Sequence, residues 1–414
     1  MNQCEEIKEC IACGNTNLEP LLDLGSQPLA NSFLKHENES ENFYPLATNY
    51  CKDCFHVQLT HKVNPDLLFK NYLYVSGTAK TQLEYFEWFA RFVHEKQEQF
   101  MSVLDIGCND GSQLDAFKKL KGKQRGQSLW DDLLTYGVDP AENLYETSSK
   151  NHSVHCGYFD KSYPNIEADA VLCQNAFAHN YDQLEFLKNM ARVVSNKGFI
   201  YITTSQADMI LNCEFDTIYH EHISFYNIKS MNELCKRAGL YIHEVVKHPI
   251  HGTSFIFVLT KNPAKTRSAY VELLIEAEKR MDLHNPEIYQ NYVEECKYII
   301  ESFAETVEQM RNQYKMIGYG APAKGNTLLN AAKIKLDFIV DDNPLKQGTF
   351  TPGMHIPVYG SDKLKEYEND DVVFVPLAWN FFDEIKKKIT EMRPNRLDMF
   401  LKTYPLVYLE SANE

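Results

Sequence analysis

Short hydrophobic runs alternate with segments of helical periodicity over the middle of the chain. Apolar residues recur at helical spacing in residues 85–94 and 176–194, which predicts two amphipathic helices. Compact hydrophobic runs predict one strand that begins at residue 102, a second that ends at residue 139, and two more at 168–175 and 198–204. Alternation of this length indicates an α/β fold with a doubly wound parallel sheet, which binds ligands at the carboxyl ends of its strands.

A similar pattern returns in the C-terminal part. Residues 264–315 are Glu-rich, helical in period and free of glycine, which predicts one or two long helices that bridge two domains. Residues 316–327 then combine a strand, a Gly-rich turn and a helix start, and DFIVDDNP at 337–344 predicts a strand that ends in carboxylates. We therefore expect a second, Rossmann-like α/β domain here.

Length and charge exclude several classes of protein. The chain has 414 residues, which suits two or three domains, and its 42 Lys and Arg against 57 Asp and Glu give a formal charge of −15. Such a surface repels phosphate backbones, so nucleic-acid binding is not expected. No apolar run approaches the roughly 18 residues of a membrane span, and MNQCEEIKEC does not resemble a signal peptide. We expect a cytoplasmic protein without membrane contact.

Four of the eleven cysteines form two tight pairs, Cys10 with Cys13 and Cys51 with Cys54. Each C-x-x-C turn aims two sulfurs at one point, so the two turns can supply the four thiolates of a tetrahedral zinc site. Four thiolates leave no open position, and the zinc is therefore expected to be structural. A redox C-x-x-C or two unrelated buried pairs are the alternatives.

The sequence SVLDIGCNDGS at 102–112 predicts a strand, a turn with two glycines and the start of a helix. Glycines let the backbone approach a ligand, and a helix start offers unpaired N–H groups. The turn resembles the first motif of S-adenosylmethionine-dependent methyltransferases, in which an acidic residue, here Asp105, ends the strand. Asp139 ends the next strand, where a carboxylate can hold a ribose. Capping of the following helix by Asp139 is an alternative that is compatible with this role.

Tyr219-His220-Glu221-His222 is the densest ionisable cluster and is expected on a turn after the fifth strand. A histidine can take a proton at neutral pH and a neighbouring carboxylate can orient it, which indicates acid–base chemistry. Two histidines two residues apart face the same way in a strand, so a metal site is one alternative. A polar surface turn is another.

The turn at 318–325 offers backbone amides and Lys324 to a ligand, which suits a diphosphate. It lacks the G-x-G-x-x-G spacing, which disfavours a nicotinamide cofactor. Trp379 and Asn380 follow a predicted strand and are candidates for the same cleft, although packing explains Trp379 equally well.

Together these motifs resemble the sugar C-methyltransferase family of deoxysugar biosynthesis. The matching stretches keep the family's order: the two Cys pairs, LLDLGSQPLANSF (21–33), NYLYVSGTAKT (71–81), LDIGCNDG (104–111), YHEH (219–222), YGAPAKGNTLLN (319–330), DDNPLKQG (341–348) and LAWN (377–380). The resemblance implies a zinc-binding domain at 1–68, a central S-adenosylmethionine-dependent methyltransferase domain at 69–246, and a Rossmann-like domain with its helical bridge at 247–414.

The resemblance also implies roles for individual residues. His222 is expected to be the general base, with Tyr219, Glu221, His179 and Tyr74 as further catalytic candidates. Contacts to the methyl donor are implied for Tyr72, Ser76, Asp105, Gly107, Asn109, Asp139, Gln174 and Asn175. Contacts to the substrate are implied for Asn175, His179, Lys324, Asn326, Trp379 and Asn380.

The activity that follows from the resemblance is methylation of a carbon next to the ketone, expected at C-3, of a nucleotide-linked 4-keto-6-deoxy sugar. A carbon next to a ketone is acidic enough for a side-chain base, and the resulting enolate carbon attacks the sulfonium methyl. The nucleotide can be dTDP, GDP or CDP, and the three-domain plan allows a complete site in a monomer. An O- or N-methyltransferase of the same fold and a non-catalytic zinc-ribbon adaptor are the alternatives.

Overall fold

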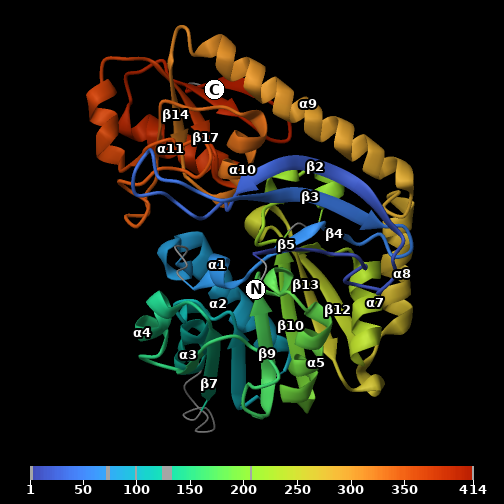
Figure 1. Cartoon of the computed structure of the whole chain (residues 1–414). Helices are drawn as coiled ribbons and strands as arrows, with labels where there is room; N and C mark the ends of the chain where they lie inside the picture. The colour runs from blue at the N-terminus through green and yellow to red at the C-terminus, as the bar shows by residue number, and fades with distance from the viewer. Residues whose placement is uncertain (1–2, 71–74, 98–99, 124–132, 206–207, 413–414) are drawn as a thin grey trace.

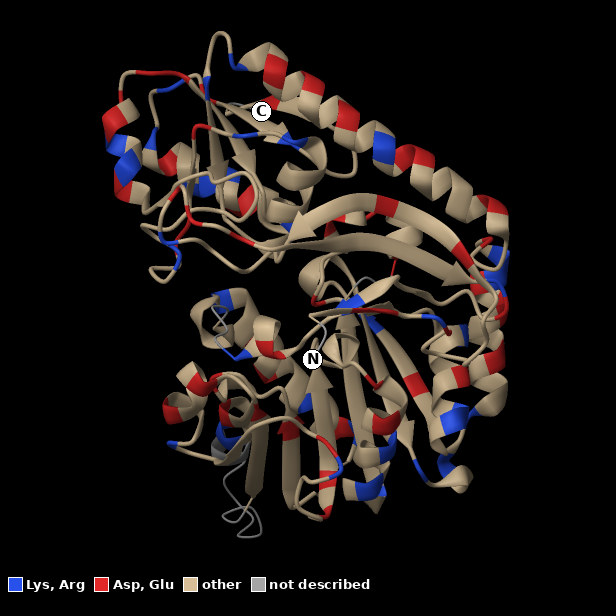
Figure 2. Cartoon of the chain, in the orientation of Figure 1, with Lys and Arg blue, Asp and Glu red and all other residues tan. Residues whose placement is uncertain are grey.

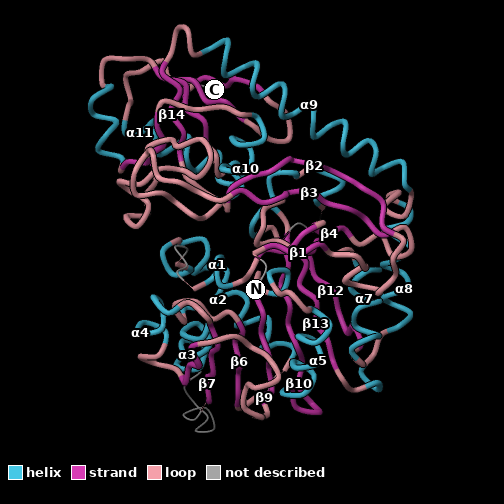
Figure 3. Tube along the Cα trace, in the orientation of Figure 1, coloured by secondary structure: helices cyan, strands magenta, loops and turns pink. Residues whose placement is uncertain are grey.

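A computed structural model describes residues 3–70, 75–97, 100–123, 133–205 and 208–412. The chain forms two α/β bodies with a layer of antiparallel strands between them (Figure 1). In the Cα trace this layer, made of β2 (Leu18–Pro28), β3 (Phe43–Cys51) and β4 (Val57–Leu59), separates the two larger sheets (Figure 3). Within the described ranges, no helix combines the length and the apolar character that crossing a membrane requires.

The central sheet has seven strands in the order β12-β13-β10-β9-β6-β7-β8. Their bounds are β6 Ser102–Ile106, β7 Leu134–Asp139, β8 Ser153–Cys156, β9 Ala168–Gln174, β10 Val194–Ser205, β12 Tyr241–His248 and β13 Ser254–Thr260. The five neighbouring strands β10, β9, β6, β7 and β8 are parallel, which confirms the doubly wound α/β fold. The edge differs from the expected parallel sheet, because β13 is antiparallel to both neighbours. Only a short connection joins β12 to β13, and parallel pairing needs a long crossover.

Helices cover both faces of this sheet, as the alternating hydrophobic pattern requires. Phe86 and Phe89 of α2 (Lys80–Lys96) and Phe117 of α3 (Ser112–Lys123) pack on the face that carries Leu172. On the opposite face, α5 (Gln183–Val193) and α7 (Ile228–Ala238) pack against Val171 and its neighbours. Alternate residues of one strand thus enter two separate cores.

The antiparallel layer includes a strand from the central part of the chain. Strand β11 (Ser224–Phe225) follows the Tyr219–His222 turn directly and pairs with β4, giving the order β11-β4-β3-β2. A two-stranded sheet of β1 (Cys4–Glu6) and β5 (His61–Val63) lies beside it. The N-terminal layer is therefore built onto the segment that carries the candidate base.

The C-terminal sheet has six strands in the order β16-β15-β14-β17-β18-β19. Their bounds are β14 Lys315–Tyr319, β15 Phe338–Val340, β16 Val358–Tyr359, β17 Val372–Pro376, β18 Met399–Lys402 and β19 Tyr408–Ser411. All pairs are parallel except β18 with β19, as expected for a Rossmann-like domain. Helices α10 (Ala323–Ala332) and α11 (Phe382–Met392) belong to this domain.

Two helices connect the α/β bodies, as the periodicity of residues 264–315 predicts. Helix α8 (Ser268–Arg280) lies beside the central sheet, and α9 (Pro286–Met310) runs from there along the C-terminal domain (Figure 1). Acidic residues recur along α9 and Asp and Glu are spread over the whole molecule (Figure 2). The outer face of α9 is therefore a solvated, acidic surface.

Candidate active site

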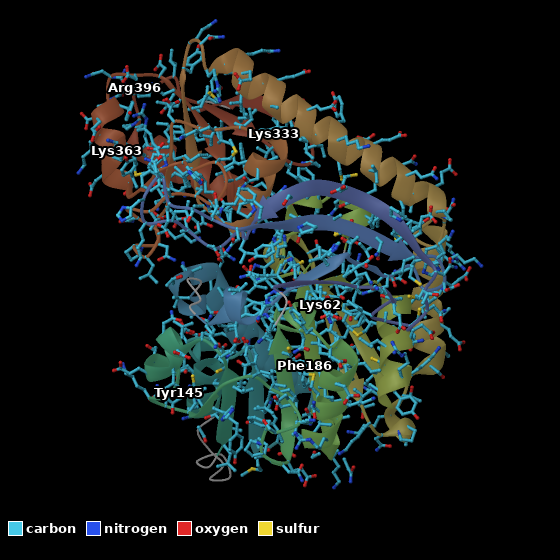
Figure 4. The ribbon with its side chains drawn as sticks, in the orientation of Figure 1. Lys62, Tyr145, Phe186, Lys333, Lys363 and Arg396 are labelled. Atoms are coloured by element: carbon cyan, nitrogen blue, oxygen red, sulfur yellow. The ribbon has the colours of Figure 1, made fainter. Side chains whose placement is uncertain are left out.

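All three parts of the chain line one cavity of about 690 Å³. The carboxyl ends of β6, β7 and β9 form one side of it, where doubly wound sheets bind ligands. Phe186 of α5, which Figure 4 labels, also lines the cavity. Residues 320–324 of the C-terminal domain form the opposite side together with Ala378, Asn380 and Phe381, and Asn31 reaches the cavity from the N-terminal layer.

Every described residue that the sequence assigns to the methyl donor lines this cavity; these are Ser76, Asp105, Gly107, Asn109, Asp139, Gln174 and Asn175. Gly107 adopts φ 79°, and a Cβ placed on it would come within 2.7 Å of the Ala176 Cβ. The turn after β6 therefore requires glycine at this position. Tyr72 and Tyr74 lie outside the described residues.

Asp139 forms hydrogen bonds with both turns of the donor side, the one after β6 and the one after β7. Its carboxylate accepts hydrogen bonds of 2.8 Å from the backbone N–H groups of Asn109 and Ala141. The short helical turn at Glu142–Leu144 has Ala141 as its N-cap and no side-chain cap, so the capping role considered for Asp139 is not confirmed. Each carboxylate oxygen has a second lone pair, so the two backbone bonds are compatible with ribose contact.

Two buried side-chain oxygens on the donor side have no hydrogen-bond partner among the described residues, Gln174 Oε1 and Asn175 Oδ1. Asn175 also adopts φ 54°, an uncommon conformation that its backbone bond to the Thr203 carbonyl holds in place. Buried polar groups without partners are rare in folded proteins. Their position in the cavity wall fits a site for a polar ligand.

Asp105 is buried at the end of β6, where burial and the charges of Asp139 and Asp110 raise the pKa of its carboxyl to about 8. Removal of a carboxylate from water is costly, so the protonated form is favoured in the free protein. A positively charged ligand beside Asp105 would reverse this preference.

Tyr219 and His222 both line the cavity and are hydrogen-bonded to each other. The Tyr219 hydroxyl lies 2.7 Å from His222 Nε2, and His222 Nδ1 lies 2.9 Å from the Thr217 carbonyl oxygen. A carbonyl only accepts, so Nδ1 carries the proton and Nε2 accepts from the Tyr219 hydroxyl. Burial lowers the pKa of His222 well below its usual value, and the neighbouring His179 lowers it further. The imidazole is therefore neutral and able to accept a proton.

The ring of His179 stacks on that of His222, with centroids 5.1 Å apart and an interplanar angle of 24°. Burial lowers the pKa of His179 to about 4. Its Nε2 is buried and has no hydrogen-bond partner among the described residues, although the ring lines the cavity. His179 thus offers a neutral imidazole nitrogen to a ligand next to the Tyr219–His222 pair.

The other two residues of the turn point elsewhere. The Nε2–H of His220 donates to the Tyr44 carbonyl at 3.3 Å, outside the cavity. The segment is a turn rather than a strand, so His220 and His222 do not face the same way, and the alternative of a metal site formed by this pair is wrong. Glu221 does not line the cavity either, which corrects its expected place there; its carboxylate accepts from Asn31 Nδ2 at 2.6 Å.

On the C-terminal side, the structure separates the four expected substrate residues. Lys324 and Asn380 line the cavity. Asn326 does not, because its side chain is buried and donates to the Ala30 carbonyl at 2.8 Å. Trp379 does not either, because its indole N–H donates to Asp216 at 2.6 Å. The side chains of Asn326 and Trp379 thus differ from their expected place in the cavity wall, and both join domains.

Lys324 lies in a cluster of buried charges. Its Nζ is 4.0 Å from Glu214 Oε2 and 4.9 Å from the Trp379 ring centroid, and it has no hydrogen-bond partner among the described residues. Burial raises the pKa values of Glu214 and Asp216, and the positive charge of Lys324 opposes this. Lys324 thus presents its ammonium group to the cavity, and the nearby Glu214 carboxylate partly balances the positive charge of that group.

The C-terminal turn repeats the backbone arrangement of the donor side. Asp341 accepts from the N–H groups of Ala321 at 2.6 Å and Asn343 at 2.8 Å, and the Gly320 N–H donates to the Val340 carbonyl at 2.7 Å. In the central domain, Asp139 and the Gly107 N–H make the matching bonds. Both sheets therefore present a glycine turn braced by a strand-end carboxylate to the same cavity.

Sequence reasoning missed several residues of the cavity wall, among them Asn31, Lys346 and His251. Asn31 and Lys346 lie in stretches that carry the family resemblance, but neither has a chemical signature of its own. His251 adopts φ 56° and burial lowers its pKa to about 4. The positive φ of His251 marks it as a candidate functional residue, and this conformation is visible only in the structure.

The four predicted zinc ligands are brought together away from the cavity. The sulfurs of Cys10 and Cys54 are 3.5 Å apart, those of Cys13 and Cys51 are 3.6 Å apart, and all four lie within 4.8 Å of one another. Sulfurs about 2.3 Å from a common tetrahedral centre stand roughly 3.8 Å apart, so the cluster has the dimensions of a four-thiolate zinc site.

Three family models match consecutive parts of the chain. A model described as "Putative zinc binding domain" matches residues 10–69, one described as "Methyltransferase domain" matches residues 78–245, and one described as "C-methyltransferase C-terminal domain" matches residues 249–401.

Individual proteins are similar to the chain over different lengths. The C-methyltransferase NovU of Streptomyces niveus is 28% identical over 397 residues, which cover 92% of this chain and 91% of NovU. A ubiquinone biosynthesis O-methyltransferase of Hydrogenovibrio crunogenus is 22% identical over 226 residues, 51% of this chain and 84% of that protein. An S-adenosylmethionine-dependent methyltransferase structure from Clostridium acetobutylicum has a TM-score of 0.33 and 10% identity, over 44% of this chain and 92% of its own. The chain has the fold of S-adenosylmethionine-dependent methyltransferases, and it is similar over nearly its whole length to a C-methyltransferase.

Proposed function

We propose that the protein transfers a methyl group from S-adenosylmethionine to the carbon next to the ketone, C-3, of a nucleotide-linked 4-keto-6-deoxy sugar. One observation carries the proposal: a neutral imidazole with a fixed tautomer, His222, shares a cavity with the donor-side turn of Gly107 and Asp139. A base and a methyl donor can therefore reach opposite sides of one substrate carbon.

The residues present fit the methyl donor. The buried oxygens of Gln174 and Asn175 lack partners among the described residues, and Gly107 lines the same part of the cavity. Asp139 would hold the ribose hydroxyls, and Asp105 would lie near positive charge. When bound, S-adenosylmethionine supplies an electrophilic methyl group.

The Tyr219–His222 pair performs the proton transfer. The α C–H bond of the keto sugar breaks as the Tyr219 oxygen takes the proton, and the Tyr219 hydroxyl proton passes to His222 Nε2 at 2.7 Å. His179 Nε2, which is buried without a partner among the described residues, donates to the oxygen that becomes the enolate. The three side chains together leave a nucleophilic carbon on the sugar.

The C-terminal side of the cavity suits the nucleotide diphosphate. Helix α10 begins at the turn of residues 320–323, and Lys324 adds a positive charge to the N–H groups of its first turn. Asp341 ends the neighbouring strand, as the ribose-binding residue of a dinucleotide fold does. The nucleotide is dTDP, GDP or CDP in this proposal, and one chain holds the whole site.

The four cysteines would hold a structural zinc ion. Four thiolates complete a tetrahedral coordination sphere, so such an ion takes no part in the reaction. Its role would be to join the ends of the segment between the two Cys pairs, which contains strand β2 and most of β3.

Incubation with S-adenosylmethionine and a panel of dTDP-, GDP- and CDP-linked 4-keto-6-deoxy sugars tests this function. The account predicts a product with the new methyl group on a quaternary carbon, visible by NMR with a ¹³C-labelled methyl donor. A methyl group on oxygen or nitrogen would favour the alternative that the match to an O-methyltransferase raises. Failure to bind S-adenosylmethionine would favour the non-catalytic adaptor.

A further inference from the structure

We infer that Asn31, a residue of the N-terminal layer, recognises the sugar by accepting a hydrogen bond from a hydroxyl or amino group, and that Glu221 is the positioning residue that orients it. The inference rests on the proposed function and adds a substrate contact from the N-terminal layer. It follows from the hydrogen bond between Asn31 and Glu221, from the buried contact of Asn326 with the Ala30 carbonyl, and from the position of Asn31 in the cavity wall.

The bond between Asn31 and Glu221 fixes which side of the amide faces the cavity. Asn31 Nδ2 donates to Glu221 Oε1 at 2.6 Å. Because a carboxylate only accepts, the amide nitrogen must face Glu221, and the amide oxygen lies on the other side of the group. Among the described residues, that oxygen has no hydrogen-bond partner, while Asn31 lines the cavity.

The backbone around Asn31 is held against the C-terminal domain. Strand β2 ends at Pro28, and the following turn is closed by the Ser32 N–H, which donates to the Leu29 carbonyl at 3.0 Å. Asn326 of α10 donates to the Ala30 carbonyl from a fully buried position. The turn therefore reaches the cavity as a fixed part of its wall.

The charge around this point favours a neutral hydrogen-bond donor as ligand. Glu221 carries the negative side of the pair, and Lys346 lines the cavity nearby, where burial lowers its pKa while Asp341 and Glu221 raise it. Glu221 belongs to the turn that carries His222, and Lys346 donates to the Ala321 carbonyl of the C-terminal turn, so Asn31 lies where these two parts of the cavity wall meet. Within the proposed function we assign the group that Asn31 binds to the sugar, and the affinity for free nucleotide tests this assignment.

Calorimetry and kinetics on Asn31→Ala test this role, with Ser32→Ala as the control in the same turn, since Ser32 is exposed and outside the cavity wall. We expect Asn31→Ala to weaken binding of a dTDP-, GDP- or CDP-linked 4-keto-6-deoxy sugar, and to raise its KM, by about tenfold. Affinities for S-adenosylmethionine and for free dTDP, GDP or CDP should stay within about twofold of wild type. Ser32→Ala should match wild type throughout.

Glu221→Ala and the double variant with Asn31→Ala separate recognition from architecture. If Glu221 acts on sugar binding through Asn31, the double variant binds the sugar nucleotide no more weakly than Asn31→Ala alone. Glu221→Gln keeps an acceptor for Asn31 and should retain more affinity than Glu221→Ala.

Three outcomes would overturn the inference. If Asn31→Ala binds the sugar nucleotide with wild-type affinity while the wild-type enzyme is active, the Asn31 contact is refuted and the proposed function stands. Equal losses of sugar, nucleotide and donor affinity together with a lower unfolding temperature would show that Asn31 only joins domains. A wild-type protein that neither binds nor methylates any of these sugar nucleotides would instead overturn the proposed function, and the sugar contact with it.

Discussion

The Tyr219 hydroxyl lies 2.7 Å from Nε2 of His222, whose other ring nitrogen is held by the Thr217 carbonyl. The two bonds leave one tautomer, in which His222 can receive a proton from Tyr219. The tautomer of the base, His222, is therefore fixed by the backbone of its own turn before any substrate is present.

Replacement of Tyr219 by Phe keeps the ring and removes only the hydroxyl. We expect kcat to fall by about 10²–10³ because the proton path to His222 is broken. Affinity for S-adenosylmethionine should be unchanged by calorimetry. Tyr145→Phe is the control, because Tyr145, labelled in Figure 4, is exposed and does not line the cavity. A Tyr219→Phe enzyme with the wild-type kcat would contradict the relay.

His222→Asn should abolish turnover while donor affinity stays near wild type, because the change removes a base and no donor contact. His220→Gln is a matched control from the same turn, since His220 contacts the Tyr44 carbonyl and not the cavity. It should keep turnover even if its unfolding temperature falls. Rates like those of wild type in His222→Asn would move the base to another residue, with His179 the next candidate.

The affinity for S-adenosylmethionine should rise with pH between about 6 and 8. The pKa of Asp105 is about 8 in the free protein, and a positively charged sulfonium ligand favours the ionised carboxylate. Binding then releases a proton, and the affinity gains at most about tenfold per pH unit. Calorimetry should show a shallower dependence for S-adenosylhomocysteine, which lacks the sulfonium charge.

Asp105→Asn provides the control for this pH dependence. Its donor affinity should be flat over the same range, because no ionisable carboxyl is left at the end of β6. A flat profile in the wild-type protein would show that Asp105 does not titrate against the donor.

Cys51→Ser should remove one ligand of the four-thiolate cluster and with it the bound zinc. We expect less than stoichiometric zinc by metal analysis and a lower unfolding temperature. Cys156→Ser is the control, because Cys156 is exposed and far from the cluster in sequence. A Cys51→Ser protein that is metal-free yet fully folded and active would refute the structural role.

The sequence predicts the α/β architecture, and it groups the candidate donor residues that line one side of the cavity, because both depend on local patterns. Asp105 and Gly107 lie on one strand and its turn, so their spacing alone places them together. The antiparallel edge at β12 and β13 was not foreseen, since pairing between distant strands leaves little trace in local periodicity.

Side-chain direction was the part that the sequence could not supply. Glu221 and His222 are neighbours in a turn, yet only His222 faces the cavity. Asn326 and Trp379 stand beside cavity residues in the chain but point into domain contacts with Ala30 and Asp216. Which side of a turn faces a ligand depends on the partners that the other domains provide.

Exchange of the substrate's α proton with solvent tests the central claim most directly. In D₂O with S-adenosylhomocysteine in place of the methyl donor, the wild-type protein should incorporate deuterium at C-3 of the keto sugar, as followed by NMR. His222→Asn and Tyr219→Phe should not catalyse this exchange. Exchange at the wild-type rate in His222→Asn would contradict the account, because the proton would then be leaving by a path that does not involve this imidazole.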